Sequence, residues 1–141
     1  MDLSVQIDGI KLKIRVAGIV STPKGFLFEK SDKNYIFPIG GKIKINETSC
    51  EALIREIQEE IGLRIDNPVL VSIFENFYDS GTEKVHEICF VYKVETMFKG
   101  TLPDNFIEVV REDLEKFKIL PKPIAEILKY DGEWFRHIII K

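Results

Sequence analysis

Apolar and polar residues alternate through the first thirty positions, and this pattern predicts strands. The alternation over residues 4–22 is broken at Asp8-Gly9, a pair that favours a tight turn. RVAGIVS (15–21) is then expected to be a strand, TPKG (22–25) a turn with well-placed Pro and Gly, and FLFEK (26–30) the returning strand. The chain therefore opens with strands joined by short turns.

The spacing of apolar residues then changes from that of a strand to that of a helix. After the polar loop SDKN (31–34), YIFPI (35–39) leads into Gly40-Gly41. Residues 47–61 have helical periodicity, and Gly62 is well suited to end a helix. At about 100° of rotation per residue, one helix face collects apolar side chains and is expected to be buried: Cys50, Leu53, Ile54, Ile57 and Ile61.

The second half of the chain predicts more strands and two short helices. Two strands, PVLVSIFENFY (68–78) and VHEICFVYKVE (85–95), are joined by the loop 79–84. TLPDN (101–105) interrupts the pattern and is followed by a short expected strand (106–110). Two short helices (111–117 and 123–130) are then expected, with Pro121 and Pro123 between them, and an apolar strand (136–140) closes the sequence. Strands on both sides of a central helix predict one layered α/β domain over residues 1–141.

Composition narrows the class of protein. The chain has 141 residues and a net charge of −3, which gives no support to binding of nucleic acid or of an anionic membrane. The first residues lack the basic and apolar segments of a signal peptide, and no apolar run reaches the roughly 18 residues that span a bilayer. Cys50 and Cys89 lack metal-ligand spacing, so we expect two buried thiols in a cytoplasmic protein.

Acidic residues gather on one side of the predicted central helix. Glu56, Glu59 and Glu60 are spaced three or four residues apart. Their side chains lie on the side of the helix away from the apolar face and on its flank. Ala52 lies one turn earlier, and its small side chain is expected to leave access to them. Like charges at this spacing weaken a helix, as do carboxylates near its C-terminal end. A solvated acidic face is one interpretation, and a divalent cation that binds the carboxylates is the other.

The whole stretch from Gly41 to Leu63 resembles the signature of the Nudix hydrolases, G-x5-E-x7-R-E-U-x-E-E-x-G-U, where U is a bulky aliphatic residue. All nine specified positions match, from Gly41 and Glu47 to Arg55-Glu56-Ile57-Gln58-Glu59-Glu60-Ile61-Gly62-Leu63. The resemblance implies an α/β/α sandwich with a mixed β-sheet, in which the signature forms a loop, a helix and a second loop. It also implies hydrolysis of a nucleoside diphosphate linked to another moiety, with Mg²⁺ or Mn²⁺.

The resemblance assigns roles to residues of the signature. Glu56, Glu59 and Glu60 are expected to bind the metal, with Glu47 in support, and Arg55 to orient these glutamates through its fixed fork of donors. Gly41 would allow close packing of the loop. The general base differs among relatives: Glu56 is the first candidate, and the candidates outside the signature are Glu87 and Glu108. Two positions depart from many relatives, Ile39 in place of proline before the glycines and Lys44 in place of glutamate.

Substrate recognition lies outside the signature. Aromatic rings can stack on a base and arginine can meet phosphate, and the candidate contacts are Arg15, Tyr35, Phe37, Phe77, Tyr78 and His86. The resemblance leaves nucleoside triphosphates, dinucleoside polyphosphates, ADP-ribose and nucleotide sugars open as substrates, and a homodimer as a candidate assembly. The alternatives are a catalytically inactive nucleotide-binding or sensor module, an RNA 5′-end pyrophosphohydrolase, which would need a basic track for the strand, and, more remotely, an isomerase of the same fold.

Overall fold

The computed structural model describes residues 1–129 and 135–141. Its elements follow the order expected from the hydrophobic pattern: β1 (Ser4–Ile7), β2 (Ile10–Ser21), β3 (Gly25–Lys30), β4 (Ile36–Lys42), α1 (Ser49–Ile61), β5 (Val69–Asp79), β6 (Lys84–Glu95), β7 (Phe106–Val110), the 3-10 helix η1 (Arg111–Lys116), α2 (Pro123–Lys129) and β8 (Arg136–Ile140).

The strands of the described residues form one eight-stranded mixed sheet. The strand order is β7-β3-β4-β2-β6-β5-β8, and β1 pairs with β2. The two longest strands, β2 and β6, lie parallel over their full length, from Ile10–Lys84 to Ser21–Glu95. β5 and β8 are also parallel, whereas the hairpin neighbours are antiparallel. The mixed sheet implied by the family resemblance is therefore confirmed.

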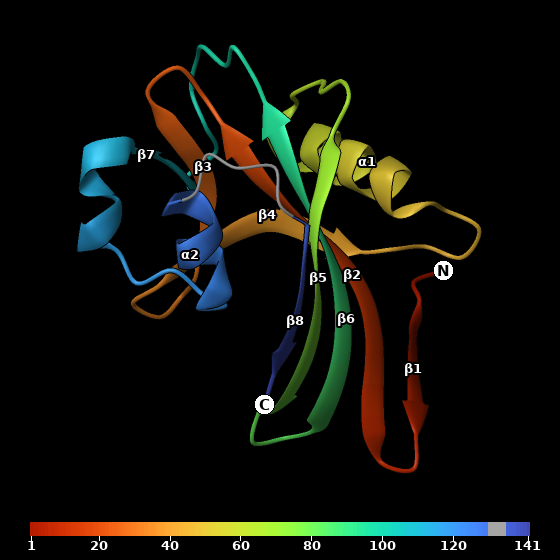
Figure 1. Ribbon diagram of the computed structural model, residues 1–141. Coiled ribbons are helices and arrows are strands. Elements are labelled where there is room, and N and C mark those ends of the chain that lie inside the picture. Colours follow the sequence, from red (N-terminus) through yellow and green to blue (C-terminus); the bar gives the residue numbers. More distant parts are fainter. Residues whose placement is uncertain (130–134) are drawn as a thin grey trace.

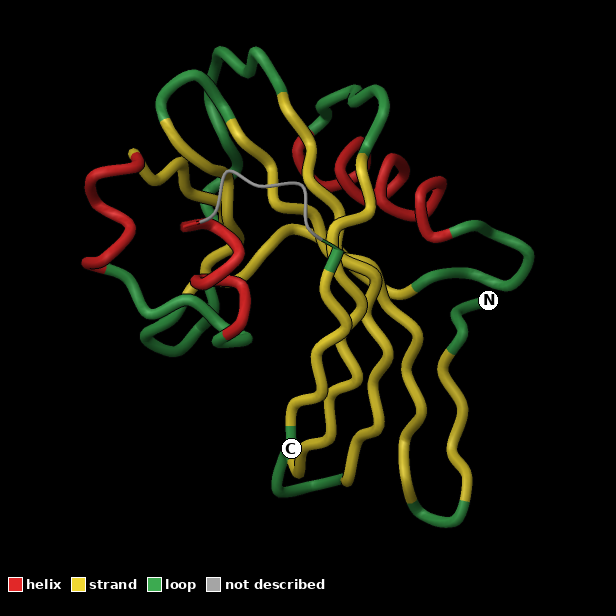
Figure 2. The backbone as a smooth tube through the Cα atoms, viewed as in Figure 1, coloured by secondary structure: helices red, strands yellow, loops and turns green. Residues whose placement is uncertain are grey.

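Helices cover both faces of the upper part of the sheet, which confirms the expected α/β/α layers (Figure 1). On one face α1 buries Ala52, Leu53 and Ile57 against β2, β3 and β4. On the other face α2 packs its apolar side chains, such as Ile124, on a separate cluster that includes Phe74 of β5. Figure 2 shows that the lower ends of β2, β6, β5 and β8 extend beyond this helical cover. None of the helices in the described residues has the length and apolar content needed to cross a bilayer.

Local sequence signals set the ends of several elements. Asp8 (φ 50°) and Gly9 (φ 78°) adopt left-handed conformations in the turn between β1 and β2, as the pair predicts. The hydroxyl of Thr48 accepts the backbone N–H of Glu51 at 3.1 Å and caps α1. Gly62 (φ 67°) ends the helix in the left-handed region and donates its N–H to the Gln58 carbonyl.

Several sequence-based expectations differ from the structure in detail. The helix begins at Ser49 rather than at residue 47, because Thr48 takes the capping position. Gly40 and Gly41 continue β4 instead of following it. The segment 111–116 is a 3-10 helix, and position 130, the expected end of the last helix, lies outside the described residues.

Two predictions of burial meet different outcomes. Cys89 is buried, as expected, whereas Cys50 is only partly buried, and both thiols are free. The prediction that Ala52 leaves access to the acidic side chains is wrong, because Ala52 is 0 % exposed. It lies four residues before Glu56, so its row of α1 faces the sheet and its small side chain allows close packing there.

Candidate active site

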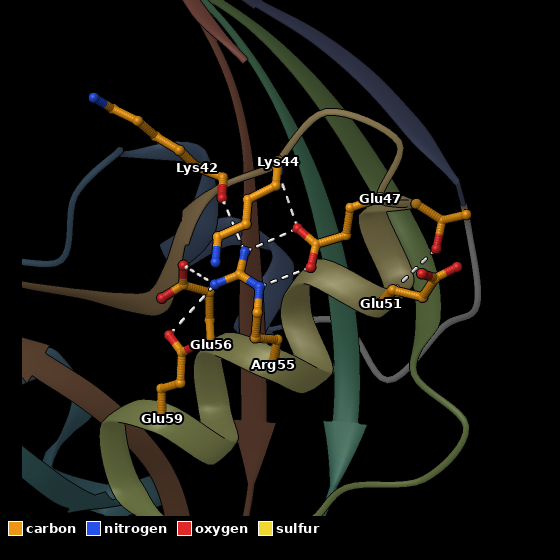
Figure 3. A network of polar contacts seen from close by, with 8 residues as sticks. Lys42, Lys44, Glu47, Glu51, Arg55, Glu56 and Glu59 are labelled. Atoms are coloured by element: carbon orange, nitrogen blue, oxygen red, sulfur yellow. Dashed lines mark hydrogen bonds and ion pairs between the residues drawn. The ribbon is translucent and has the colours of Figure 1, made fainter. Parts of the chain in front are cut away.

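Arg55 is the centre of a network that joins the loop after β4 to α1 (Figure 3). Its Nε donates to Glu47 Oε2 at 2.7 Å, and its Nη2 donates to Glu47 Oε1 at 2.9 Å. Its Nη1 donates to Glu56 Oε1 at 2.9 Å and reaches Glu59 Oε2 at 3.4 Å. Nη2 also contacts the Lys42 carbonyl at 3.3 Å. The guanidinium therefore holds three of the four glutamates named from the signature.

The pairing of Arg55 with Glu47 is the strongest electrostatic contact of the network. Both side chains are largely buried, with 20 % and 14 % exposure. The hydrogen bond from Arg55, together with the backbone N–H of Lys44, lowers the pKa of Glu47 to about 2 against the cost of burial. The hydrogen bonds to Glu47 and then to Glu56 raise the pKa of Arg55, against the cost of burial. Glu47 is thus fixed as a carboxylate that ties the loop to the helix.

Gly41 gives Glu56 its place against the sheet. A Cβ at Gly41 would lie 2.5 Å from the carboxyl carbon of Glu56, a distance that real side chains do not reach. The absence of a side chain on β4 therefore creates the space that the Glu56 carboxylate fills. This is the close approach that the resemblance assigned to Gly41.

Glu60 lies one turn beyond Glu56 on the same row of α1, and its surroundings are acidic. Its Oε2 is buried and has no hydrogen-bond partner. Burial, followed by repulsion from Glu29 and from Glu56, raises the pKa of Glu60 well above its usual range, and the charge of Arg15 opposes this. Burial likewise raises the pKa of Glu29, with Arg15 opposing and Glu56 adding to the rise. The carboxyl groups of Glu29, Glu56 and Glu60 are therefore close enough to repel one another.

Glu29 is a member of this group that sequence reasoning missed. It belongs to β3, where it pairs with Phe37 of β4, and it reaches the helix only because β3 and β4 lie side by side under α1. An isolated glutamate near the end of a predicted strand carries no signal of that neighbourhood. The order of the strands in the sheet is the information that was lacking.

The carboxylate oxygens of these glutamates are the kind of ligand that a hard divalent cation binds. Oxygen ligands, carboxylates above all, are what Mg²⁺ prefers, and the unpartnered Oε2 of Glu60 offers such a ligand. Within residues 1–129 and 135–141, however, no three acidic, histidine or cysteine side chains already converge as a metal site. The Arg55 contacts explain this, since they turn Glu47, Glu56 and Glu59 towards the guanidinium. Binding of a cation would require these side chains to rotate away from Arg55.

A cavity of about 640 Å³ is lined by residues of β2, β4, β5 and β6, and its volume is within the usual size range for small-ligand sites. Four of the candidate substrate contacts line it together: Arg15 of β2, Tyr35 and Phe37 at β4, and Tyr78 of β5. The rings of Tyr35 and Phe37 lie 6.1 Å apart. The structure therefore gathers residues from three strands that the sequence offered only separately.

Glu87, considered from the sequence as a base, also lines this cavity. It is 9 % exposed, and its Oε1 lies 3.6 Å from Nη1 of Arg15. Its Oε2 accepts a hydrogen bond of 3.3 Å from Nδ2 of Asn76. Asn76 lines the cavity too and was not among the candidates, although the predicted hairpin 68–78/85–95 places it opposite Glu87, as the structure does.

Three other candidates lie elsewhere. Phe77 and His86 stack on each other with ring centroids 4.4 Å apart, and strand alternation turns them to the face opposite that of their neighbours Asn76 and Glu87. Glu108 accepts a hydrogen bond of 2.6 Å from the Thr22 hydroxyl at the turn between β2 and β3. The structure does not bring these three residues to the cavity.

Comparisons with known proteins agree with this geometry. Residues 11–137 match the family model of the NUDIX domain. The chain is 32 % identical over 127 residues to the low-salt glycan biosynthesis protein Agl8 of Haloferax volcanii, which covers 90 % of this chain and 78 % of that protein.

Solved structures share the fold at low identity. A MutT protein from Bacillus halodurans has a TM-score of 0.73 at 20 % identity, with 89 % of each chain covered. A MutT NUDIX hydrolase from Burkholderia pseudomallei has a TM-score of 0.68 at 18 % identity, covering 84 % of this chain and 98 % of the other. The Ap4A hydrolase of Caenorhabditis elegans has a TM-score of 0.54 at 17 % identity, covering 75 % and 86 %.

Proposed function

This chain belongs to the Nudix hydrolase family, and on that premise we propose that it is a metal-dependent pyrophosphohydrolase of a nucleoside diphosphate linked to another moiety. The observation that carries the proposal is the group formed by Glu29, Glu56 and Glu60. Burial, followed by repulsion from Glu29 and from Glu56, raises the pKa of Glu60, and its Oε2 has no hydrogen-bond partner. A divalent cation would compensate this repulsion, and the Nudix signature supplies further carboxylates beside it.

We assign the metal to Glu56, Glu59 and Glu60, with Glu47 in support. Bound there, Mg²⁺ or Mn²⁺ would neutralise the pyrophosphate and make an attacking water more acidic. Arg55 keeps Glu47, Glu56 and Glu59 on one side of α1 through the contacts in Figure 3. These contacts hold the carboxylates close together, and the side chains would turn from Arg55 towards a metal when it binds.

The proposed reaction is substitution by water at phosphorus. Glu56 accepts a proton from the water, the water oxygen bonds to phosphorus, and the bond from that phosphorus to the bridging oxygen breaks. The leaving phosphate takes the bridging oxygen with its electron pair. Arg15 is suited to bind the diphosphate, since it lines the cavity and its charge also acts on Glu29 and Glu60.

Among the open substrate classes, we propose a nucleotide sugar as the first to test. The relative from Haloferax volcanii is named for glycan biosynthesis, a process in which sugars are commonly carried as nucleotide conjugates. The cavity of about 640 Å³ has aromatic walls that suit a base. The proposal therefore places the base in the cavity and the pyrophosphate at the carboxylates.

The test is a hydrolysis panel on the purified protein with and without Mg²⁺, with products separated by chromatography. The panel contains nucleotide sugars, nucleoside triphosphates, ADP-ribose and dinucleoside polyphosphates. We expect turnover of at least one class only when metal is present. We expect Glu59→Gln and Glu60→Gln each to lower kcat by about 100-fold or more while the protein stays folded, since glutamine keeps the shape and loses the charge.

Glu51→Gln is the matched control, because Glu51 is an exposed glutamate in the first turn of the same helix. Its activity should equal that of the unaltered protein. Near-normal turnover in both Glu59→Gln and Glu60→Gln would refute the metal assignment. A folded protein that binds Mg²⁺ but hydrolyses nothing in the panel would favour the sensor alternative.

A further inference from the structure

The cavity contains a buried carboxylate whose bonding capacity is incompletely used. Glu87 makes two polar contacts there, 3.6 Å to Arg15 and 3.3 Å to Asn76. Both are longer than the usual range of about 2.7–3.2 Å. A carboxylate offers about four lone-pair positions and, when ionised, donates nothing. Glu87 therefore presents an acceptor to whatever enters the cavity.

The surroundings of Glu87 select a flat ligand. Tyr35 and Phe37 form one wall, and Pro38, Phe74 and Cys89 supply apolar surface. Asn76, on the neighbouring strand, uses its amide N–H to hold Glu87, which leaves its carbonyl oxygen as a second acceptor. A cavity lined by aromatic side chains and by adjacent acceptors matches a planar group with adjacent N–H donors.

Nucleobases differ in the hydrogen-bond donors that their edges present. Guanine presents two neighbouring donors, N1–H and the N2 amino group, and can give both to one carboxylate. Adenine presents its N6 amino group beside the acceptor N1, which a carboxylate repels, and cytosine has the same donor–acceptor pattern at N4 and N3. Uracil and thymine present a single N–H between two carbonyl oxygens. Guanine is the common base that satisfies a carboxylate with two hydrogen bonds.

Resting on the proposed function, we propose that Glu87 is a specificity-determining residue that selects guanine nucleotides by accepting hydrogen bonds from N1–H and N2–H. Asn76 is the positioning residue that holds Glu87 from β5. Arg15 lies beside Glu87, and its charge also acts on Glu60 of α1, so we expect the diphosphate of a base bound here to be directed towards the proposed metal ligands. In this assignment Glu87 acts in recognition and is not the general base.

Equilibrium binding measurements test the assignment of Glu87 and do not require catalysis. Titration calorimetry compares GMP with AMP on the unaltered protein in EDTA, and again on Glu87→Gln. We expect GMP to bind roughly 5- to 150-fold more tightly than AMP, the discrimination that a bidentate contact to a base supports. Glutamine replaces one acceptor by a donor and fits the edge of adenine, so Glu87→Gln should lose most of the preference or reverse it.

The control is Glu95→Gln, which removes the same charge from an exposed position near the other end of β6 and should keep the preference. Equal binding of GMP and AMP, binding of neither, or an unchanged preference in Glu87→Gln would overturn the proposal. The unaltered protein alone can refute it, even if a variant fails to fold.

Hydrolysis of GDP-glucose and ADP-glucose separates this inference from the proposed function. We expect kcat/KM to favour GDP-glucose by a similar factor, with the effect of Glu87→Gln confined to that ratio. A preference for GMP without any hydrolysis would refute the proposed function and leave the assignment of Glu87. An equal loss of turnover on both sugars, with GMP binding unchanged, would assign Glu87 to the reaction and overturn its role in recognition.

Discussion

The tie between Glu47 and Arg55 yields a sharp prediction for stability. Glu47→Gln keeps the size of the side chain, and it removes the charge that accepts two hydrogen bonds from Arg55, at 2.7 and 2.9 Å. The amide can still accept one of them. The loop before α1 should then be less firmly attached to the helix, and the free energy of unfolding should fall.

The magnitude follows from the pKa of Glu47. Its decrease from 4.5 to about 2 corresponds to about 3 kcal/mol at 1.36 kcal/mol per pKa unit. Partial exposure and the bond that glutamine retains both reduce this value. We expect Glu47→Gln to lower the free energy of unfolding by about 2 kcal/mol at pH 7, within the range for hydrogen bonds to charged groups.

The effect of Glu47→Gln on the free energy of unfolding should depend on pH. Because the pKa of Glu47 is lower in the folded protein than in the unfolded chain, its stabilisation is complete well above pH 4.5 and is lost as the pH falls through 4.5 towards 2. The difference between the unaltered protein and Glu47→Gln should therefore be constant from about pH 6 to 8 and should shrink below about pH 5. The raised pKa of Glu60 acts with the opposite sign, but it is common to both proteins and cancels in the difference.

Urea unfolding in EDTA, followed by circular dichroism at several pH values, measures this difference without any contribution from metal. Glu51→Gln is the control, because Glu51 is exposed and should change the free energy of unfolding by only a few tenths of a kcal/mol. A difference that stays constant down to pH 3, or that is absent at pH 7, would refute the assigned role of the Glu47–Arg55 pair.

Three further results are expected. Millimolar Mg²⁺ should raise the melting temperature in thermal unfolding scans, because it binds only the folded carboxylates, and Glu60→Gln should abolish the shift; a shift retained in that variant would count against Glu60 as a ligand. Gly41→Ala should lower kcat by about 10-fold or more with a smaller effect on stability, since a Cβ there displaces the Glu56 carboxylate. Gly40→Ala should chiefly lower stability, because its Cβ would lie 2.0 Å from the Val16 carbonyl oxygen of β2. The opposite ranking of the two variants in activity assays and urea titrations would contradict this. Thr48→Ala should cost about 1 kcal/mol in urea unfolding through loss of the cap on α1, and an unchanged midpoint would show that the cap is dispensable.

Much of the fold could be predicted from local pattern. The turn at Asp8-Gly9 and the helix end at Gly62 follow from residues whose backbone preferences are strong, and the structure has both. The burial of Ala52 could not be predicted in this way. A helical wheel ranks faces by hydrophobicity, but the angle at which α1 lies on β2 and β4 decides which small residue is enclosed.

The candidate site likewise has a part that the sequence predicts and a part that it does not. The network around Arg55 follows from a signature confined to 23 residues, and the structure joins Glu47, Glu56 and Glu59 to it. The parts that were missed come from sheet order and strand pairing: Glu29 reaches α1 across β3 and β4, and Asn76 meets Glu87 through the pairing of β5 with β6. The approach of Glu29 to α1 depends on a strand order that composition does not encode, whereas the pairing of Asn76 with Glu87 could have been predicted from the hairpin.

The parallel pairing of β2 with β6 has a consequence for how the chain folds. Its partners are far apart in sequence, as Ile10 and Lys84 are, so the central contact of the sheet forms only after a long loop has closed. Such non-local pairing places folding nearer to milliseconds or seconds than to microseconds. The Arg55 network draws on residues 42–59 alone, whereas the cavity needs β2, β4, β5 and β6 together. During refolding the helix and its loop should therefore become protected early, and the cavity should appear only with the final assembly of the sheet.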